Sequence, residues 1–334
     1  MSTIVDIYCH IYPDRFFQEM IAAAPKLGNI AQRLRGIPKL FDLTARFKEM
    51  DEYGDYRQIV SLPNPPIEDI VAPDVGLRLA RIANDEMAEL CRRHPGRFPT
   101  FAAALCLTDI DGSIAEARRA VKELGAAGVL IYTSIAGEPL DDPKFESFFA
   151  EMAALDATIW LHPERTAAMP DYRTEKKSRF EMWWCLGWPY DTSVAMIRMV
   201  FCGLFDRHPS LRIITHHLGG MIPFYDGRVG PGLKVLGART FDEDYSKILP
   251  SLKRPHMDYL REFYADTAMF GGGEHALRCG LEFFGSGRVV FATDAPLGPI
   301  APTIAAIKKL ELAPDDQRKL FCGNAEHLLK TKFS

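Results

Sequence analysis

Short, strongly apolar runs alternate with longer amphipathic stretches along almost the whole chain. The apolar runs are rich in β-branched and aromatic residues, which is typical of buried strands. The longer stretches have the apolar spacing and the flanking residues of helices. We therefore predict eight strands, at residues 3–8, 56–62, 98–106, 128–133, 157–162, 212–216, 263–268 and 288–293.

Two of the intervening helices have recognisable ends. The segment IAEARRAVKELG is expected to be capped by Asp111 or Ser113 and to stop at Gly125. The segment SVAMIRMVFCGLFDRH is expected to be capped by Asp191 or Thr192, and the proline that follows it ends the helix. Strands that are apolar on both faces, each followed by such a helix, predict a parallel sheet covered by helices.

Eight strand–helix units in 334 residues fit a closed (β/α)8 barrel, the TIM-barrel fold, better than an open sheet. The alternative is a doubly wound sheet, but no glycine-rich phosphate loop follows the first strand. A barrel of this size forms one domain, so residues 1–334 are assigned to a single domain.

Two long connections, at residues 13–45 and 164–190, interrupt the regular alternation. Loops that follow barrel strands lie on the catalytic face, so we expect both segments to form a lid over the substrate. The second segment contains Trp184 and Trp188, which are candidate substrate contacts. Packing in the core or at an interface is the alternative role for these aromatic side chains.

Composition narrows the class of protein. The chain is 47% apolar and has a formal net charge of −4, and its basic residues form no stripe, so a nucleic-acid partner is not expected. No apolar run is long enough for a membrane span. Seven cysteines without C-x-x-C spacing indicate reduced thiols, and the first strand begins too early to leave room for a signal peptide. We expect a cytoplasmic protein.

Polar side chains with ligand chemistry stand where four predicted strands end: Tyr8 and His10, His162, His216 and His217, and Asp294. In a closed barrel, the carboxyl ends of the strands meet at one mouth. Imidazoles and a carboxylate gathered there suit Zn²⁺ or Mn²⁺ and leave a position for water or substrate.

Five motifs occur in one order between Val5 and Leu329: VDIYCHIYP, WLHP, ITHHLGGMIPF, FATDAPLG and FCGNAEHLL. Together they resemble the amidohydrolase-related family, whose members include aminocarboxymuconate semialdehyde decarboxylase and the resorcylate-type decarboxylases. Each motif is short, but the ordered set is specific. The resemblance implies a metal-dependent barrel enzyme.

The resemblance also implies residue roles. His10, His162 and Asp294 match the family's metal ligands, and Asp294 also matches a group that takes part in proton transfer. His217 matches the catalytic histidine because it precedes Leu-Gly-Gly. His216 is one place too early for that role and, because side chains alternate along a strand, is expected to point the other way.

Tyr8 stands where the family usually has histidine or glutamate. A phenol has an ordinary pKa near 10 and binds a metal well only as phenolate. Tyr8 is therefore a metal ligand, a hydrogen-bond or proton donor to substrate, or a space-filling residue, and we favour the donor role. No lysine follows the fourth strand, which reads GVLIYTS, so we expect one metal ion, zinc in the first place and manganese in the second.

Three further residues have two interpretations each, and a fourth has one. Arg46 resembles a family arginine and is either an anchor for a substrate carboxylate or a solvated helix charge. Asn64 either lines the mouth or makes a turn before two prolines. Asp266 either supports the residues of the site or packs in the barrel, and Asn324 is expected to be structural, as a cap of the last helix.

We predict non-oxidative decarboxylation of a small aromatic or unsaturated carboxylic acid, with His217 and Asp294 as proton carriers. The first alternative is hydrolysis of a C–C, lactone or amide bond by a metal-bound water. The second is a metal-free barrel that binds a small molecule, an interpretation that only Tyr8 supports. The expected partners are a small carboxylate substrate and further copies of the chain in a dimer or larger homo-oligomer.

Overall fold

The computed structural model describes residues 3–24, 27 and 34–333, so part of the expected lid segment 13–45 lies outside the described residues. All eight predicted strands are present, although two of them are only two residues long. They are β1 (Ile4–His10), β2 (Tyr56–Ser61), β3 (Ala102–Ala103), β4 (Gly128–Tyr132), β7 (Thr158–His162), β8 (Arg212–Thr215), β9 (Tyr264–Asp266) and β10 (Val289–Val290). A small hairpin of β5 (Ser134–Ile135) and β6 (Glu138–Pro139) was not predicted.

The eight strands form a closed parallel ring. β1 pairs with β2, and β3, β4, β7, β8, β9 and β10 form a second sheet in that order. Parallel bridges join the two sheets, Val60 with Phe101 on one side and Cys9 with Ala295 on the other. The predicted barrel is confirmed, and the doubly wound alternative is wrong.

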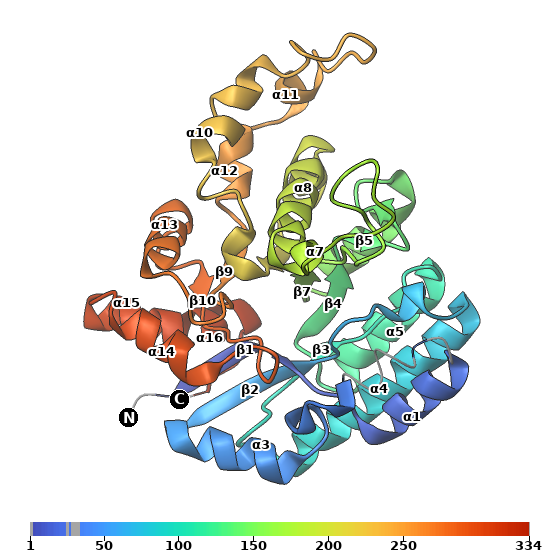
Figure 1. Cartoon of the computed structure of the whole chain (residues 1–334), viewed down its shortest axis with the longest axis vertical. Coiled ribbons are helices and arrows are strands. Elements are labelled where there is room, and N and C mark those ends of the chain that lie inside the picture. The colour runs from blue at the N-terminus through green and yellow to red at the C-terminus, as the bar shows by residue number, and fades with distance from the viewer. Residues whose placement is uncertain (1–2, 25–26, 28–33, 334) are drawn as a thin grey trace.

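Helices surround the strands (Figure 1). Their bounds are α1 (Asp14–Ala23), α3 (Leu43–Met50), α4 (Pro73–Arg93), α5 (Ile110–Lys122), α6 (Glu146–Ala154), α7 (Met182–Cys185), α8 (Gly187–Phe201), α9 (Leu204–Arg207), α10 (Asp226–Val229), α11 (Ile248–Ser251), α12 (His256–Leu260), α13 (Glu274–Phe284), α14 (Ile300–Lys308), α15 (Pro314–Arg318) and α16 (Asn324–Leu329). Residues 224–262, which include α10, α11 and α12, project from the barrel as an arm (Figure 1). No helix in the described ranges combines the length and the apolar character that crossing a membrane requires.

The start of α5 differs from the prediction. The Asp109 side chain accepts a hydrogen bond of 2.9 Å from the backbone N–H of Gly112, so Asp109 is the cap and the helix begins at the next residue. The expected caps, Asp111 and Ser113, lie inside the helix. The predicted stop at Gly125 is just beyond the end of the helix, where a positive φ of 79° suits glycine.

Helix α8 also begins earlier than predicted, at Gly187. Pro189 lies in its first turn, where backbone N–H groups have no partner within the helix, so the N–H that proline lacks is not needed. Asp191 is not the cap, because its carboxylate accepts instead from the backbone N–H of Arg165 at 2.8 Å, and Thr192 is buried within the helix. The earlier start places the Trp188 side chain on a helix rather than on a loop.

The side chain of Asp6 joins the strands at which the barrel closes. Its buried carboxylate accepts a 3.0 Å hydrogen bond from the backbone N–H of Thr293 and further bonds from the hydroxyls of Thr293 and Tyr56. It thereby ties β1 to β2 and to the segment after β10. The backbone N–H of Ile7 adds a 2.9 Å bond to the carbonyl of Phe291. The first and last strands are thus fixed side by side.

The pKa of Asp6 makes this closure testable. Burial raises the pKa from 3.8 to about 6, against the hydrogen bonds from Thr293 and Tyr56. The folded chain therefore favours the protonated carboxyl, and this contribution to stability is complete below pH 3.8 and is lost as the pH rises through 6. From pH 7.5 to pH 5, the free energy of unfolding of the wild type should increase by about 1.4 kcal/mol relative to Asp6→Asn. Urea unfolding of both proteins in the presence of a chelator measures the difference, and an equal difference at both pH values contradicts it.

Candidate active site

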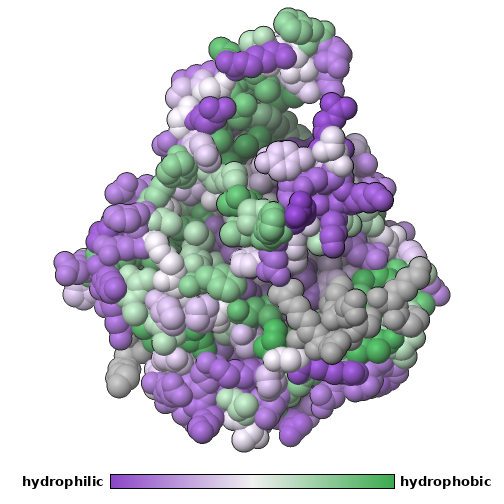
Figure 2. Space-filling model, in the orientation of Figure 1, coloured by the Kyte–Doolittle hydropathy of each residue, from purple (hydrophilic) through white to green (hydrophobic). Residues whose placement is uncertain are grey.

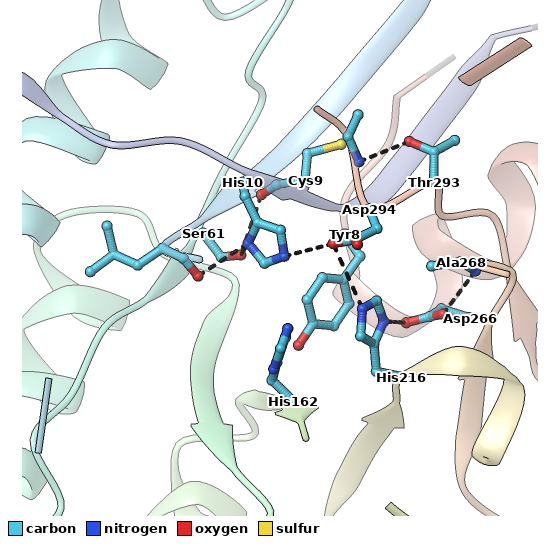
Figure 3. Close-up of polar contacts among 12 residues, drawn as sticks. Tyr8, Cys9, His10, Ser61, His162, His216, Asp266, Ala268, Thr293 and Asp294 are labelled. Atoms are coloured by element: carbon cyan, nitrogen blue, oxygen red, sulfur yellow. Dashed lines mark hydrogen bonds and ion pairs between the residues drawn. The ribbon is translucent and has the colours of Figure 1, made fainter. Parts of the chain in front are cut away.

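The polar residues at the strand ends meet at the mouth of the barrel (Figure 3). His10 Nε2 lies 2.9 Å from Asp294 Oδ1. The His162 ring centroid lies 5.6 Å from that of His10 and 5.1 Å from that of His216. All these side chains are buried. The structure therefore brings together the residues that the sequence singled out, although β1 and the segment carrying Asp294 are at opposite ends of the chain.

Three histidines are oriented in the same way. The Nδ1 atom of each faces an oxygen: His10 faces the Leu62 carbonyl at 3.1 Å, His162 the Pro163 carbonyl at 2.7 Å, and His216 the Asp266 carboxylate at 2.5 Å. These contacts are hydrogen bonds when Nδ1 carries the proton. Each Nε2 is then left with a lone pair for a cation, which is the usual arrangement behind histidine metal ligands.

His216 does not point away from the site, so that prediction is wrong. Strand β8 ends at Thr215, and strand alternation therefore no longer governs the residue that follows. The His216 ring stacks on the Tyr8 ring at 4.1 Å, and its Nε2 lies 3.8 Å from Asp294 Oδ1. The backbone then turns through positive φ at His217 and Leu218 (53° and 56°), so that two consecutive imidazoles lie 3.8 Å apart at the mouth.

The donor atoms of the site suit a divalent cation. Five buried atoms lack a well-aligned hydrogen bond: Tyr8 Oη, His10 Nε2, His216 Nε2, His217 Nδ1 and Asp294 Oδ1. Buried polar atoms are rarely left in this state unless an ion or ligand completes them. Within the described part of the chain, one ligand atom each from His216, His217 and Asp294 lies within 4.8 Å of the other two. Imidazole nitrogens with a carboxylate oxygen are a donor set that zinc and manganese accept.

Charge at the site is carried by Asp294 and His216. Burial raises the pKa of Asp294, but the nearby rings of His10 and His216, in their protonated forms, outweigh it and hold the pKa below its ordinary value. Burial lowers the pKa of His216, but the Asp266 carboxylate outweighs that effect and raises it to about 9. The Nε2 proton of His216 must therefore leave before that nitrogen can bind a cation. An ionised carboxylate is therefore available at the centre of the site.

Three other side chains are neutral in this environment. Burial raises the pKa of the Tyr8 phenol well above 10, and the carboxylates of Asp266 and Asp294 add to the effect. Burial and the nearby charge of His216 lower the pKa values of His162 and His217 well below 6.5. A neutral imidazole has a free nitrogen that binds a metal or accepts a proton.

The segment 164–190 contacts the histidines of the site through Trp188. The Trp188 ring stacks on His217 at 5.9 Å and meets His162 edge-on at 5.5 Å, while its N–H donates to the Arg165 carbonyl at 2.9 Å. Trp184 contacts Trp188 rather than the histidines, and the centroids of the two rings lie 6.3 Å apart. Of the two predicted tryptophans, Trp188 borders the site directly.

The Arg46 side chain and the Asn64 backbone carbonyl both have hydrogen-bond partners within the fold. The Arg46 guanidinium is buried and donates to the His10 carbonyl at 2.6 Å and to Gln58 Oε1 at 2.7 Å. The solvated-charge interpretation is therefore wrong, and the side chain holds the backbone of a candidate ligand. The Asn64 carbonyl accepts from the Tyr12 hydroxyl at 2.9 Å in a turn before Pro65, in agreement with the turn interpretation.

Asp266 and Asn324 support other residues. Besides His216, Asp266 accepts from the backbone N–H of His217 at 3.1 Å. Asn324 donates to the carbonyls of Ser286 and Val289, both at 2.7 Å, so its expected structural role is confirmed. The sequence analysis missed Tyr132, whose ring lies 5.5 Å from His162. The feature of the sequence that could have identified Tyr132 as a site residue is its position at the end of β4.

Comparisons with known proteins agree with the motifs. The family model described as amidohydrolase matches residues 5–331. Gamma-resorcylate decarboxylase of Rhodococcus jostii (strain RHA1) is 33% identical over 306 residues, which cover 87% of this chain and 89% of that protein. The 2-amino-3-carboxymuconate-6-semialdehyde decarboxylase of Dictyostelium discoideum is 30% identical over 261 residues, which cover 77% and 68%. The crystal structure of a dihydroxybenzoic acid decarboxylase from Polaromonas sp. JS666, with bound manganese and the inhibitor 2-nitroresorcinol, matches with a TM-score of 0.79 and 27% identity over 99% of this chain and 97% of that chain.

The orientation of His216 gives a prediction about metal affinity. In Asp266→Asn, the amide N–H₂ group faces Nδ1 of His216 and forces the imidazole proton onto Nε2, which then has no lone pair for a metal. We expect the affinity for Mn²⁺ or Zn²⁺ to fall by about 10- to 100-fold while the fold is kept. Metal titration and circular dichroism measure both effects, with the surface variant Asp316→Asn as the control. Unchanged affinity means that His216 is not a ligand.

Proposed function

Since the chain belongs to the amidohydrolase family, and the relatives described above are decarboxylases, we propose that it is a metal-dependent, non-oxidative decarboxylase of a small aromatic or unsaturated carboxylic acid. The observation that carries this proposal is the convergence of buried, unpartnered imidazole nitrogens and a carboxylate oxygen at the barrel mouth. The hydrolytic alternative has no support among those relatives. The metal-free alternative leaves the unpartnered atoms without an explanation.

We assign one divalent ion to Asp294 and His10, which lie 2.9 Å apart, and to His162, which matches a family ligand; we add His216 because its Nε2 lies 3.8 Å from the same carboxylate oxygen. Zinc was the first expectation from the sequence, and manganese is the ion bound in the Polaromonas relative; this donor set suits either. When bound, the ion supplies a Lewis acid that orients the substrate's oxygens and stabilises charge that develops on them.

The protein's own groups then move one proton. The ring or unsaturated carbon that bears the carboxylate gains a proton, the bond to the carboxyl carbon breaks, and its electron pair restores the unsaturated system as CO₂ leaves. His217 and Asp294 are the proton carriers in this proposal, because both face the site and neither has its full set of hydrogen bonds. The proton comes from solvent or from an acidic group of the substrate, is taken up by one of these two side chains and is passed to the carbon. The stacked Trp188 covers His217 and keeps water from it.

The test of this function uses the purified chain loaded with Mn²⁺ or Zn²⁺ and a panel of hydroxybenzoic acids, with CO₂ release as the measurement. We expect turnover that a chelator abolishes and that the returned metal restores. His217→Ala should keep the metal and lose about 10²-fold or more of the rate. Chelator-resistant turnover, or no CO₂ from any acid in the panel, contradicts the proposal.

Tyr8 is proposed to act on the substrate as a neutral hydrogen-bond or proton donor. Its phenol oxygen is buried and unpartnered, and forming a phenolate near neutral pH requires a pKa drop of about three units, roughly 4 kcal/mol. Tyr8→Phe should therefore keep the metal content and fold but lower turnover or substrate affinity. Elemental analysis together with steady-state kinetics separates this outcome from the ligand role, in which the variant loses its metal.

We also propose that the chain forms a homo-oligomer through the arm. Phe224, Val235 and Phe241 are 76%, 55% and 97% exposed, and Figure 2 shows apolar side chains on this projecting part of the surface. Exposed apolar groups of this size are typical of contacts between chains. Sedimentation velocity tests the proposal, and a monomer contradicts it. The cytoplasmic location stays an expectation from the sequence.

A further inference from the structure

The donor atoms at the mouth of the barrel are closed off from solvent. Nε2 of His10, Nδ1 of His217 and Oδ1 of Asp294 are all buried. A ligand that reaches them from solvent has to pass through the residues that cover the mouth. The strands of the ring are joined by hydrogen bonds and are the least able to open, so the passage has to form between the loops that follow them.

A row of aromatic rings leads from these atoms to the surface. The ring centroid of Trp188 lies 5.9 Å from that of His217 and 6.3 Å from that of Trp184. The ring centroid of Phe270 lies 5.6 Å from that of Trp184. Exposure differs greatly between the two ends of the row, with 8% at His217 and 47% at Phe270. The row therefore separates the site from solvent on this side of the mouth.

The outermost contact of this row joins two loops that are not neighbours in the ring. Trp184 lies in α7, which follows β7, and Phe270 follows β9. Strand β8 lies between β7 and β9, and the two histidines that follow β8 belong to the site. The contact between Trp184 and Phe270 therefore bridges the end of β8.

This bridge consists of ring packing. Within the part of the chain that the structure describes, no hydrogen bond or ion pair joins residues 180–188 to residues 267–273. The indole N–H of Trp184 donates at 2.7 Å to Glu181, a residue of its own loop. A pair of aromatic rings shifts an equilibrium by only about 2- to 10-fold, so the contact can form and break at low cost.

The loop that carries Phe270 has an unusual backbone. Phe270 has a positive φ of 55°, which is unfavourable for a residue with a side chain and is found where function requires it. Glycines follow at positions 271, 272 and 273, and the first and third have φ values of 69° and 63°. Glycine changes its backbone angles at low cost, so this loop has a hinge directly beside the ring.

We propose that the contact between Trp184 and Phe270 is the gate of the site. While the two rings are in contact the mouth is closed over His217, and when they separate the site is open to ligands from solvent. This inference goes beyond the proposed function, because it concerns access to the site and holds whatever reaction takes place there. None of the motifs that relate the chain to its family includes either residue.

The first experiment measures how fast His217 of the full chain reacts with diethyl pyrocarbonate, which acylates neutral imidazole. Mass spectrometry of peptides follows each histidine separately. In Phe270→Ala the rate at His217 should rise by about 2- to 10-fold, because the ring contact no longer favours the closed state. His327, an exposed histidine on α16, is the internal reference and should react equally fast in every variant.

Further variants test whether the ring contact itself is responsible. Trp184→Leu should also raise the rate, and the double variant should react no faster than the faster single variant, because both changes remove the same contact. Phe270→Tyr keeps the ring and should behave like the wild type. The control is Phe180→Ala: Phe180 is also an exposed phenylalanine with a positive φ, 54°, but its ring lies against Arg179, and its loss should leave the rate unchanged.

Exchange of Mn²⁺ gives a second readout. In Phe270→Ala, the rate of uptake and the rate of removal by a chelator should rise by the same factor and leave Kd unchanged, because a gate alters the path to the site and not its donor atoms. Circular dichroism establishes that each variant is folded. The two single variants test the contact from opposite sides, so either one is sufficient if the other does not fold.

An unchanged reactivity of His217 in Phe270→Ala and Trp184→Leu overturns the gate. Faster removal of Mn²⁺ with a weaker affinity and unchanged uptake also overturns it, because the substitution has then altered the site itself. A chain that binds no Mn²⁺ contradicts the proposed function, whereas the reactivity of His217 still decides the gate.

Discussion

The site depends on how the barrel closes. The carboxylate of Asp6 accepts hydrogen bonds from Thr293 and Tyr56 and so fixes the first strand against its neighbour in the ring and against the segment after the last strand. His10 follows Asp6 by four residues, and Asp294 follows Thr293 directly. The 2.9 Å approach of His10 to Asp294 is therefore a consequence of this closure. The buried carboxylate of Asp6, which accepts several hydrogen bonds, thereby fixes the position of Asp294, whose Oδ1 has no hydrogen-bond partner.

The second determinant is the backbone after β8. Two neighbouring residues of a strand face opposite sides, yet His216 and His217 both face the mouth. This is possible because the strand has ended and the chain passes through left-handed φ values at His217 and Leu218. Such values are costly for residues with a side chain, and they are found where function requires them. Asp266 stabilises the turn, since it accepts from the His216 ring and from the His217 backbone.

The sequence was sufficient for the fold and for the set of residues at the mouth, because strand patterns and strand ends are local properties. It was insufficient where the answer depended on backbone geometry or on distant partners. Strand alternation gave the wrong orientation for His216, since the pattern does not show that β8 stops one residue earlier. Arg46 was placed on a solvated face or at the mouth, but its partners, Gln58 and the His10 carbonyl, are distant in sequence. Tyr132 was overlooked because an aromatic residue at a strand end resembles ordinary core.

The separation of His10 and Asp294 along the chain has a consequence for biosynthesis. His10 is made 284 residues before Asp294, the carboxylate that it meets. Domains generally fold as units as they leave the ribosome, and the ring cannot close before its last strand has been synthesised. The two residues can therefore hold the proposed ion together only after Asp294 has been made. Until then the histidines are separate side chains, and the donor set proposed for the ion exists only once the ring has closed.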